Sequence, residues 1–374
     1  MLINKKQNIN VLQEKTSKMN NKTDLKLLIG GAQHKFSHLQ EFANIFEKLG
    51  GSYKLVLDTD YVNGFPSKNF KNWITPYKKF NKLILEFRPD LVFIDRQSQF
   101  GQAAIKAKLP LFVHLRGDYW SELEWAKQTI NSSFKSKSIL YFKEKNAKQC
   151  FENARVILPL SNYLKKIVEK HYPEKPVETF HQGINPDMWF KDKKMKLKHP
   201  CVGMIQDANI WGKTKEMLIL NKVLESLPDV TFYWVGDGPY REKITSQLDK
   251  YENFKWLGRL EHPEGVREFL SSIDIYALVT GFDTLGMTTQ EAELMEKPVI
   301  VSKTGGTSEA MIENTTGFLV ELGDHIEWIN KINHLLNDVK KCKKMGELGR
   351  KFVIEEFSWD KKTHDFRNIC KKYL

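Results

Sequence analysis

GFDTLGMTTQEAELMEKPVIVSKTGGTSEAM (residues 281–311) is the most informative stretch of this 374-residue chain. Its two acids, Asp283 and Glu291, stand eight positions apart with Gly286 between them, and a helix is expected to start near Met287. Such a loop directs backbone N–H groups and the positive end of a helix dipole at one point, which suits phosphate or sugar oxygens. From these residues alone, a solvated carboxylate at Glu291 and a helix cap at Asp283 remain alternatives.

Strand-like and helical runs alternate on both sides of this stretch. Buried parallel strands are predicted in LKLLIGG, KLVLDTD, DLVFID, LPLFVHL, ARVILPLS and VETFH of the first half, and in CVGMIQ, VTFYWVGDG, FKWLGR, IDIYALVT, PVIVSKTG and GFLVELGD of the second. The pattern predicts two α/β domains of Rossmann-like type, with ligand bound between them at the carboxyl ends of the strands.

The domain boundaries follow from the same runs. The Lys-rich stretch FKDKKMKLKHP interrupts the pattern and predicts a linker. We expect a flexible extension over residues 1–24, a first domain over 25–189, the linker over 190–199, a second domain over 200–355, and a last helix over 356–374.

Composition excludes several classes of protein. With 41% hydrophobic and 28% charged residues, the chain is neither disordered nor fibrous. No apolar run reaches the ~20 residues of a membrane-spanning helix, and the first 24 residues lack the apolar core of a signal peptide, so a cytoplasmic protein is expected. The four cysteines are widely scattered, which favours reduced thiols over disulfides or a zinc site.

Further candidate residues follow other predicted strands. The glycines of VGDGP, Gly236 among them, and the pair Gly30 and Gly31 permit sharp turns and close approach to a ligand, although plain turns explain them as well. His114 ends the run LPLFVHL and is followed by Arg116 and Asp118; a buried, hydrogen-bonded histidine is the alternative at that position.

A motif in the first half would indicate a bound metal ion instead. Asp58 and Asp60 form a D-x-D, a pattern in which two carboxylates can hold a divalent ion on a diphosphate. The motif has no supporting context in this sequence, so a metal-independent protein is predicted.

The second half resembles the retaining nucleotide-sugar glycosyltransferases of the GT-B fold, and glycosyltransferase family 4 in particular. The family's signature is two acids eight positions apart followed by Glu-Ala, a Pro-Val strand, Gly-Gly and a further Glu. The matching positions are Asp283, Gly286, Glu291, Ala292, Pro298, Val299, Gly305, Gly306 and Glu309. The resemblance also covers VGDGP (235–239), TTGFLVELGD (315–324) and EEFSWD (355–360), and implies that the last helix returns to the first domain.

The resemblance implies a role for each of these positions. Glu291 corresponds to the acid that binds the donor ribose, Asp283 to the acid that binds hydroxyls of the transferred sugar, and Lys213 to the lysine on the donor diphosphate. Catalytic roles are expected for Lys213, Asp283 and His114, and acceptor-side roles for Arg116 and Asp118. The residues expected to contact the donor are Gly30, Gly31, Gly236, Gly286, Met287, Thr288 and Glu291.

Two departures from the family pattern leave an alternative open. The first acid is Asp283 where the family usually has Glu, and the stretch GMIQDANIWGK (203–213) lacks the family's arginine. The expected function is retaining transfer of a hexose-type sugar from a UDP- or GDP-sugar to a lipid or glycan, without metal or other cofactor. A weak or inactive nucleotide-sugar-binding partner subunit is the alternative.

The acceptor is predicted from the distribution of charge. Residues 1–200 carry 35 Lys and Arg against 19 Asp and Glu, whereas residues 201–374 carry 23 against 27. Lysines alternate with apolar residues over 134–175, as on surfaces that contact anionic lipid headgroups, although a solvated helical face is the ordinary explanation. We expect a peripheral enzyme at the cytoplasmic face of a membrane with a lipid or lipid-linked glycan acceptor, and no nucleic-acid partner, since nucleic-acid binding would leave residues 201–374 unexplained.

Overall fold

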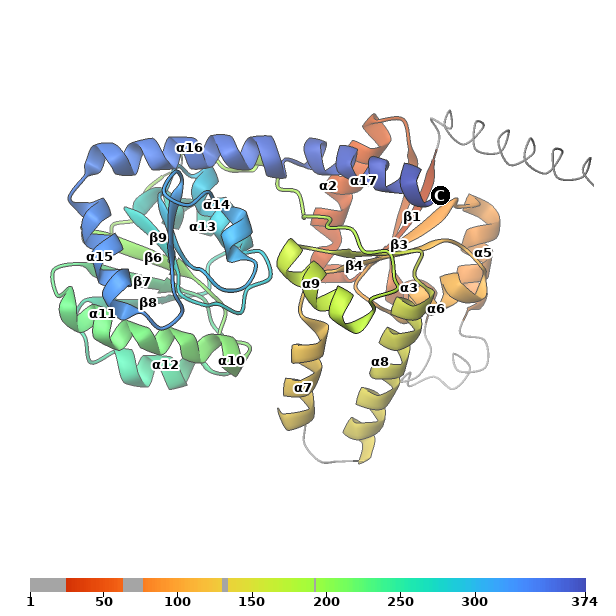
Figure 1. Ribbon diagram of the computed structural model, residues 1–374, viewed down its shortest axis with the longest axis horizontal. Helices are drawn as coiled ribbons and strands as arrows, with labels where there is room; N and C mark the ends of the chain where they lie inside the picture. The colour runs from red at the N-terminus through yellow and green to blue at the C-terminus, as the bar shows by residue number, and fades with distance from the viewer. Residues whose placement is uncertain (1–24, 63–76, 130–133, 192) are drawn as a thin grey trace, which may run out of the picture. The chain divides into compact units, whose positions relative to one another are not determined.

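The computed structural model describes residues 25–62, 77–129, 134–191 and 193–374. The predicted extension over residues 1–24 lies outside these ranges. The chain divides into two compact units. The first holds the residues up to Leu160, Leu164–Gly183 and Trp359–Leu374, and the second holds Ser161–Tyr163 and Ile184–Ser358. Each unit is a parallel sheet covered by helices (Figure 1).

The first unit contains a five-stranded parallel sheet in the order β2-β1-β3-β4-β5. Its strands are mostly continuous apolar runs because helices cover both faces. They are β1 (Lys26–Gly31), β2 (Ser52–Leu57), β3 (Leu91–Asp95), β4 (Leu111–Leu115) and β5 (Val156–Pro159). The helices are η1 (Gln33–Lys35), α2 (Phe36–Lys48), α3 (Asp58–Tyr61), α5 (Lys78–Phe87), α6 (Gln99–Lys106), α7 (Tyr119–Thr129), α8 (Phe134–Asn153), α9 (Asn162–His171) and α17 (Trp359–Tyr373).

The predicted strand VETFH is wrong. Residues 177–181 make a single isolated bridge, from Val177 to Ile157, and run beside β5 with the Glu178 and Phe180 N–H groups donating to it. No strand is formed by these residues, and the Phe180 carbonyl oxygen lies 3.2 Å from His114 Nε2.

The last helix, α17, belongs to the first unit, as the resemblance implies. The Phe366 ring is fully buried and meets the Phe42 ring edge-on, with centroids 5.0 Å apart. The Trp359 indole N–H donates to Glu41 at 2.8 Å. The C-terminal helix therefore completes the core of a unit whose strands all come from the first half of the chain.

The second unit contains a six-stranded parallel sheet in the order β11-β10-β9-β6-β7-β8. The strands are β6 (Cys201–Ile205), β7 (Thr231–Val235), β8 (Phe254–Gly258), β9 (Ile275–Leu278), β10 (Val299–Ser302) and β11 (Gly317–Val320). Its helices are η2 (Pro186–Met188), α10 (Trp211–Thr214), η3 (Lys215–Ile219), α11 (Leu220–Ser226), α12 (Arg241–Leu248), α13 (Glu264–Ser272), α14 (Met287–Leu294), η4 (Thr307–Ala310), α15 (His325–Leu336) and α16 (Val339–Phe357).

The strand order of the second unit reverses between β6 and β9. From β6 the chain builds outward through β7 and β8, and then returns to place β9 on the other side of β6. In open parallel sheets, ligands bind outside the carboxyl ends of the strands at such a switch point. Lys213 lies in α10, the first helix after β6, and Asp283 lies in the loop after β9.

The chain passes between the units at Gly183–Ile184 and at Ser358–Trp359. The sequence interpretation placed these passages over 190–199 and near residue 356.

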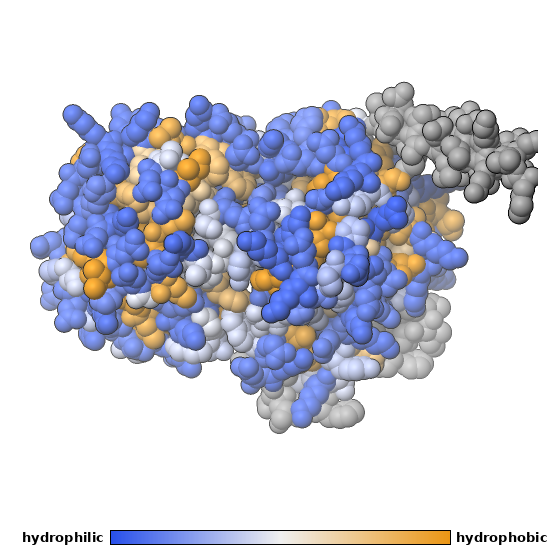
Figure 2. All heavy atoms as spheres, in the orientation of Figure 1, coloured by the Kyte–Doolittle hydropathy of each residue, from blue (hydrophilic) through white to orange (hydrophobic). Residues whose placement is uncertain are grey.

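The face drawn in Figure 2 is largely hydrophilic, and no described helix is both long and apolar enough to cross a bilayer. All four cysteines are unpaired, as expected.

One buried carboxyl group of α14 predicts a pH-dependent stability. The Glu293 side chain is fully buried beside Gly349 of α16, and neither carboxyl oxygen has a hydrogen-bond partner. Burial raises the pKa of Glu293 well above its usual value. Since the folded protein resists an ionisation that the unfolded chain undergoes freely, the contribution of Glu293 to stability is most favourable in acid and is lost as the pH rises.

Glu293→Gln should therefore stabilise the protein more at pH 8 than at pH 4.5. We expect the difference in free energy of unfolding between variant and wild type to be larger at pH 8 than at pH 4.5, as measured by urea unfolding. Glu356→Gln, at an exposed position of α16, is the control. An equal difference at both pH values would contradict the assignment.

Candidate active site

The loops at the switch point of the second unit place a lysine against a carboxylate. The Lys213 ammonium donates to Asp283 Oδ2 at 2.5 Å, and the side chains are 22% and 21% exposed. The Gly286 N–H donates to Asp283 Oδ1 at 3.1 Å. These three residues, two from one motif and one from a stretch 70 residues earlier, thus form one polar centre.

The Asp283 carboxyl group is ionised at neutral pH. Burial raises its pKa, but the charge of Lys213 and the hydrogen bonds that Lys213 and the Gly286 amide donate outweigh burial, so the pKa lies below its usual value. An ionised carboxylate only accepts hydrogen bonds. Its remaining lone pairs are suited to hydroxyl groups.

Helix α14 begins at Met287, as predicted from the sequence. Gly286 precedes it in the left-handed region, with a φ of 76°, where glycine is the least strained residue. The first N–H groups of a helix have no partner within it, so those of Met287 and Thr288 mark a position suited to an anion. The Thr288 hydroxyl lies 2.5 Å from the Tyr276 hydroxyl.

Glu291 lies one turn into α14 and is 7% exposed, so the alternative of a solvated carboxylate is wrong. Its Oε1 lies 2.9 Å from His262 Nε2, whereas Oε2 is buried and has no partner in the protein. Gln206, at the end of β6, also holds a buried oxygen without a partner, while its amide nitrogen donates to the Lys213 carbonyl at 3.3 Å. Two acceptors near the carboxyl edge of the sheet therefore lack donors.

Two side chains that support this centre escaped the sequence interpretation. Glu216 accepts hydrogen bonds from the Thr280 hydroxyl at 2.6 Å and the Gly281 N–H at 2.8 Å, so it fastens the loop of Asp283 to the segment after Lys213. His262 fixes the orientation of Glu291. Only their positions in the chain could have identified them, since Glu216 follows Lys213 by three residues and His262 lies in the loop after β8.

Gly236 allows a close backbone approach. It follows β7 with a φ of 144°, and a Cβ there would lie 2.1 Å from the Gln206 carbonyl oxygen. This close packing alone explains why the residue is glycine, so the expected contact of Gly236 with the donor stays a prediction. Nearby, Arg259 follows β8 and pairs with Asp207 at 3.1 Å, which brings a guanidinium to the stretch that lacks an arginine of its own.

In the first unit, packing accounts for Gly30 and Gly31 at the end of β1. A Cβ at Gly30 would lie 2.5 Å from Asp58 Oδ1, and one at Gly31 would lie 2.2 Å from a Leu39 methyl carbon. A side chain at either position would require these neighbours to move. The predicted contact of these glycines with the donor stays a prediction.

His114 lies in β4 and is 3% exposed. Its Nδ1 is 3.2 Å from Asp95 Oδ1, and its Nε2 is 3.2 Å from the Phe180 carbonyl oxygen. Burial lowers the pKa of His114, which favours the neutral ring. Because both ring nitrogens face protein acceptors, the geometry favours a structural histidine, and the predicted catalytic role remains a prediction.

The two residues expected on the acceptor side have protein partners. Arg116 lies 3.9 Å from Asp95. Asp118 precedes α7 and accepts hydrogen bonds from the Trp120 and Ser121 N–H groups at 3.2 Å and from the Ser121 hydroxyl at 2.6 Å. Asp118 thus caps the start of α7.

The D-x-D residues differ in environment. Burial raises the pKa of Asp58 to about 6, whereas Asp60 is exposed. Within the described ranges, one group of three side chains has the spacing of metal ligands, namely His199, Cys201 and Asp274. These residues lie where β6 and β9 begin, at the opposite edge of the sheet from Asp283.

The sequence of the second unit matches a known family. Residues 193–352 match the family model of the glycosyl transferases, group 1. The chain is 26% identical over 192 residues to the sulfoquinovosyl transferase SQD2 of Arabidopsis thaliana, which is 50% of this chain and 37% of that protein. It is 30% identical over 168 residues to a GDP-mannose-dependent monoacylated alpha-(1-6)-phosphatidylinositol monomannoside mannosyltransferase of Corynebacterium glutamicum, which is 43% of this chain and 44% of that protein.

Solved structures resemble the whole chain in fold. A glycosyltransferase from Rickettsia africae superposes with a TM-score of 0.71 at 19% identity, over 94% of this chain and 99% of that one. Anabaena Alr3699/HepE in complex with UDP and glucose gives 0.65 at 16% identity, over 92% and 99%. Residues 193–352 are therefore similar to the group 1 glycosyl transferases, and the chain has the GT-B fold.

Proposed function

We propose that this chain transfers a hexose-type sugar from a nucleotide diphosphate sugar to an acceptor with retention at the anomeric carbon. The observation that carries the proposal is the Lys213–Asp283 pair at the start of α14, with the buried Glu291 Oε2 one turn into that helix. This arrangement offers a cation for a diphosphate and carboxylates for hydroxyl groups.

In this mechanism, Lys213 and the first N–H groups of α14 stabilise the charge that develops on the departing diphosphate. Asp283 is ionised and accepts from hydroxyls of the sugar, and Glu291 Oε2 accepts from the ribose. We propose that no covalent glycosyl intermediate forms, that the acceptor attacks the face from which the diphosphate departs, and that the fixed cation and amides take the place of a metal ion.

Arg259 bears on the alternative of an inactive partner subunit. Its pairing with Asp207 brings a second cation to the loop before Lys213. We propose that Arg259 supplies the charge that the missing arginine would provide, which favours an active enzyme. Nucleotide release distinguishes the two functions, because the partner subunit would bind the donor without releasing UDP or GDP.

The acceptor is proposed to be a lipid or lipid-linked glycan. Lys143 and Lys145 are exposed on α8, and Lys166 is exposed on α9 beside the partly buried Lys165. Each such lysine near an anionic membrane surface contributes roughly 1 kcal/mol of attraction. The Corynebacterium relative is named for a phosphatidylinositol-based acceptor, which supports this class of substrate.

A donor screen tests the function directly. The full chain is incubated with UDP- or GDP-sugars and a lipid extract that supplies the acceptor, with and without EDTA. The UDP or GDP that is released is then measured. Release with one donor in the presence of EDTA is the expected result. Loss of turnover in EDTA with recovery in Mn²⁺ would replace the metal-independent mechanism by one in which Asp58 and Asp60 hold an ion.

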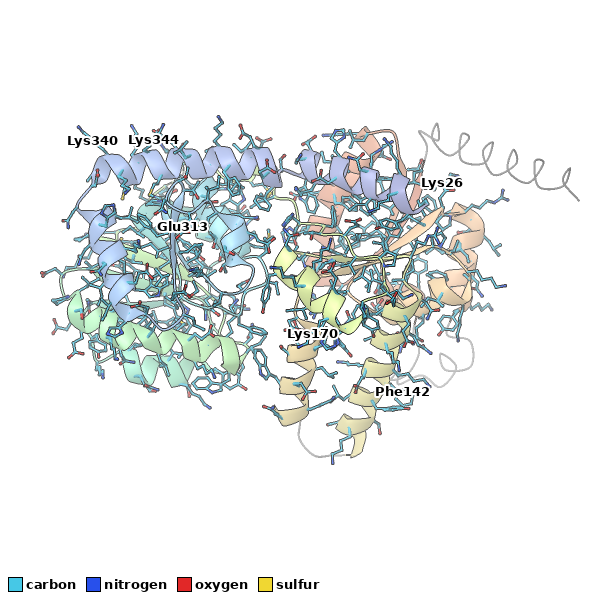
Figure 3. The ribbon with its side chains drawn as sticks, in the orientation of Figure 1. Lys26, Phe142, Lys170, Glu313, Lys340 and Lys344 are labelled. Carbon is cyan, nitrogen blue, oxygen red and sulfur yellow. The ribbon has the colours of Figure 1, made fainter. Side chains whose placement is uncertain are left out.

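Substitutions at the polar centre should separate binding from catalysis. Lys213→Ala should lower kcat about 100-fold or more, because it removes charge stabilisation specific to the transition state. Glu291→Ala should mainly raise KM, about 10-fold to 100-fold, because ribose contacts persist from the ground state to the transition state. The controls are the exposed Lys215→Ala and Glu313→Ala (Figure 3). Wild-type kinetics in both variants would show that neither Lys213 nor Glu291 belongs to the active site.

Membrane association is tested by flotation with liposomes. The chain should float with anionic vesicles at low salt and dissociate as the ionic strength rises, since screening weakens the attraction. Replacing Lys143, Lys145, Lys165 and Lys166 by Gln should abolish flotation. The exposed Lys340 and Lys344 of α16 provide a control pair whose replacement leaves flotation unchanged (Figure 3). Unaltered flotation of the fourfold variant would refute the proposed surface.

A further inference from the structure

Three side chains with different donor atoms meet where the central strands of the second unit begin. His199 Nδ1 lies 2.8 Å from Asp274 Oδ2 and 3.6 Å from Cys201 Sγ. One ligand atom from each residue lies within 4.8 Å of those of the other two. The predicted catalytic and donor-binding positions include none of these residues, so the proposed function does not explain the cluster.

The sheet holds two of the three residues in place. Cys201 is the first residue of β6, and Asp274 directly precedes β9, which pairs with β6. The Asp274 N–H donates to the Cys201 carbonyl at 3.3 Å, and the Cys201 N–H donates to Asp274 Oδ2 at 2.8 Å. These backbone contacts set the positions of the thiol and the carboxylate before any ligand binds. His199 reaches them from the segment that leads into β6.

The distances in the cluster match those of a tetrahedral zinc site. With Zn–S bonds near 2.3 Å and Zn–N and Zn–O bonds near 2.0 Å, ligand atoms stand roughly 3.3–3.6 Å apart. The distance from Cys201 Sγ to His199 Nδ1 already has this value, and Asp274 Oδ2 lies somewhat closer to His199. A thiol, an imidazole and a carboxylate form a donor set that zinc accepts, whereas Mg²⁺ and Ca²⁺ prefer oxygen ligands.

The charge of the cluster suits a divalent cation. A zinc ion bound to one thiolate and one carboxylate forms a neutral site. Lys297 is near enough for its charge to act on Cys201 and Asp274, and this charge stabilises the thiolate. The Lys297 ammonium donates to the Ser271 and Ile273 carbonyls at 3.3 and 2.8 Å, so it is held at the end of α13.

A cavity of about 730 Å³ gives an ion access to the cluster. His199 and Asp274 line it, with side chains 50% and 37% exposed, whereas Cys201 is fully buried. An ion can enter from this side, and water can take the fourth position. The other charged residues of the lining are Lys191, Lys194, Glu296, Lys297 and Lys343. A neutral metal site tolerates these lysines, because a group without net charge interacts weakly with them.

Zinc binding at this cluster would replace a proton. Burial raises the pKa of Cys201 to about 12, so the sulfur carries a proton in the free protein. When Zn²⁺ binds, that proton passes to solvent and a sulfur lone pair bonds to the metal, because coordination ionises a thiol. His199 binds through Nδ1 as the neutral ring, with its proton on Nε2. The step releases one proton and changes no oxidation state.

We propose that His199, Cys201 and Asp274 bind a zinc ion that fastens the segment before β6 to the start of β9. The opposite ends of these two strands lead to Lys213 and Asp283, so the ion stabilises the sheet and takes no part in catalysis. The scattered cysteines gave no sign of this site, because one cysteine supplies a ligand and Asp274 stands 73 residues after it. The inference does not rest on the proposed function.

Cobalt titration tests the site with a visible probe. The full chain, prepared without a histidine tag and freed of metal with a chelator, is titrated with Co²⁺ and then with Zn²⁺. One equivalent of Co²⁺ should bind and give the absorption of tetrahedral cobalt, with a charge-transfer band from one thiolate. Zn²⁺ should displace the cobalt, because zinc favours a tetrahedral site with sulfur and nitrogen ligands.

Matched variants locate the ligands. Cys201→Ala should abolish the charge-transfer band, whereas Cys342→Ala, at a second thiol that lines the cavity, should leave it unchanged. His199→Gln should weaken Co²⁺ binding at least about 10-fold. His364→Gln, at an exposed position of α17, should bind like the wild type. Zinc should raise the Tm of the wild type but not that of His199→Gln, since a ligand stabilises the folded state that binds it.

Three results would overturn the proposal. These are the absence of a charge-transfer band with Co²⁺, an unchanged band in a folded Cys201→Ala variant, and equal Co²⁺ affinities of the wild type and His199→Gln. The proposed function is tested separately, because the cluster lies at the opposite edge of the sheet from Asp283. Removal of zinc should lower the Tm and leave nucleotide release unchanged, whereas zinc binding without turnover of any donor would contradict the glycosyltransferase activity alone.

Discussion

The hydrogen bond between Lys213 and Asp283 is the contact on which the polar centre of the second unit depends. It joins the loops that follow β6 and β9, which meet because the strand order reverses there. Glu216 makes a second connection between the same segments through Thr280 and Gly281. A polar pair this close keeps Asp283 ionised and holds the start of α14 in place, so charge and backbone geometry are established together.

The features of this centre that could be predicted from the sequence are the local ones. The start of α14 at Met287, the turn at Gly286 and the spacing of the two acids each depend on a few neighbouring residues. The partners could not be predicted, because His262 stands 29 positions before Glu291. Only the packing of α14 against its surroundings brings such pairs together, and residue type alone does not choose among the available histidines.

The first unit illustrates the opposite difficulty, because reactive residue types there serve the fold. Asp118 caps α7. This role could be predicted from the sequence, because Ser121, which donates to Asp118, stands only three positions later. His114 has both ring nitrogens facing acceptors, and the interrupted strand after β5 leaves the Phe180 carbonyl for one of them. The strands themselves could mostly be predicted, since buried parallel strands are continuous apolar runs.

The unpaired acceptors of the second unit constrain the chemistry of its ligand. Glu291 Oε2 and Gln206 Oε1 are buried at the edge that carries Lys213, and each unpaired buried group costs about 1–3 kcal/mol. A phosphate ion cannot satisfy them, because it mainly accepts hydrogen bonds, whereas hydroxyl groups donate. Lys213 donates one of its three N–H groups to Asp283, and a phosphate at the same edge would accept from the others. A ligand that carries both hydroxyls and a phosphate meets all three requirements, and a nucleotide diphosphate sugar combines these groups in one molecule.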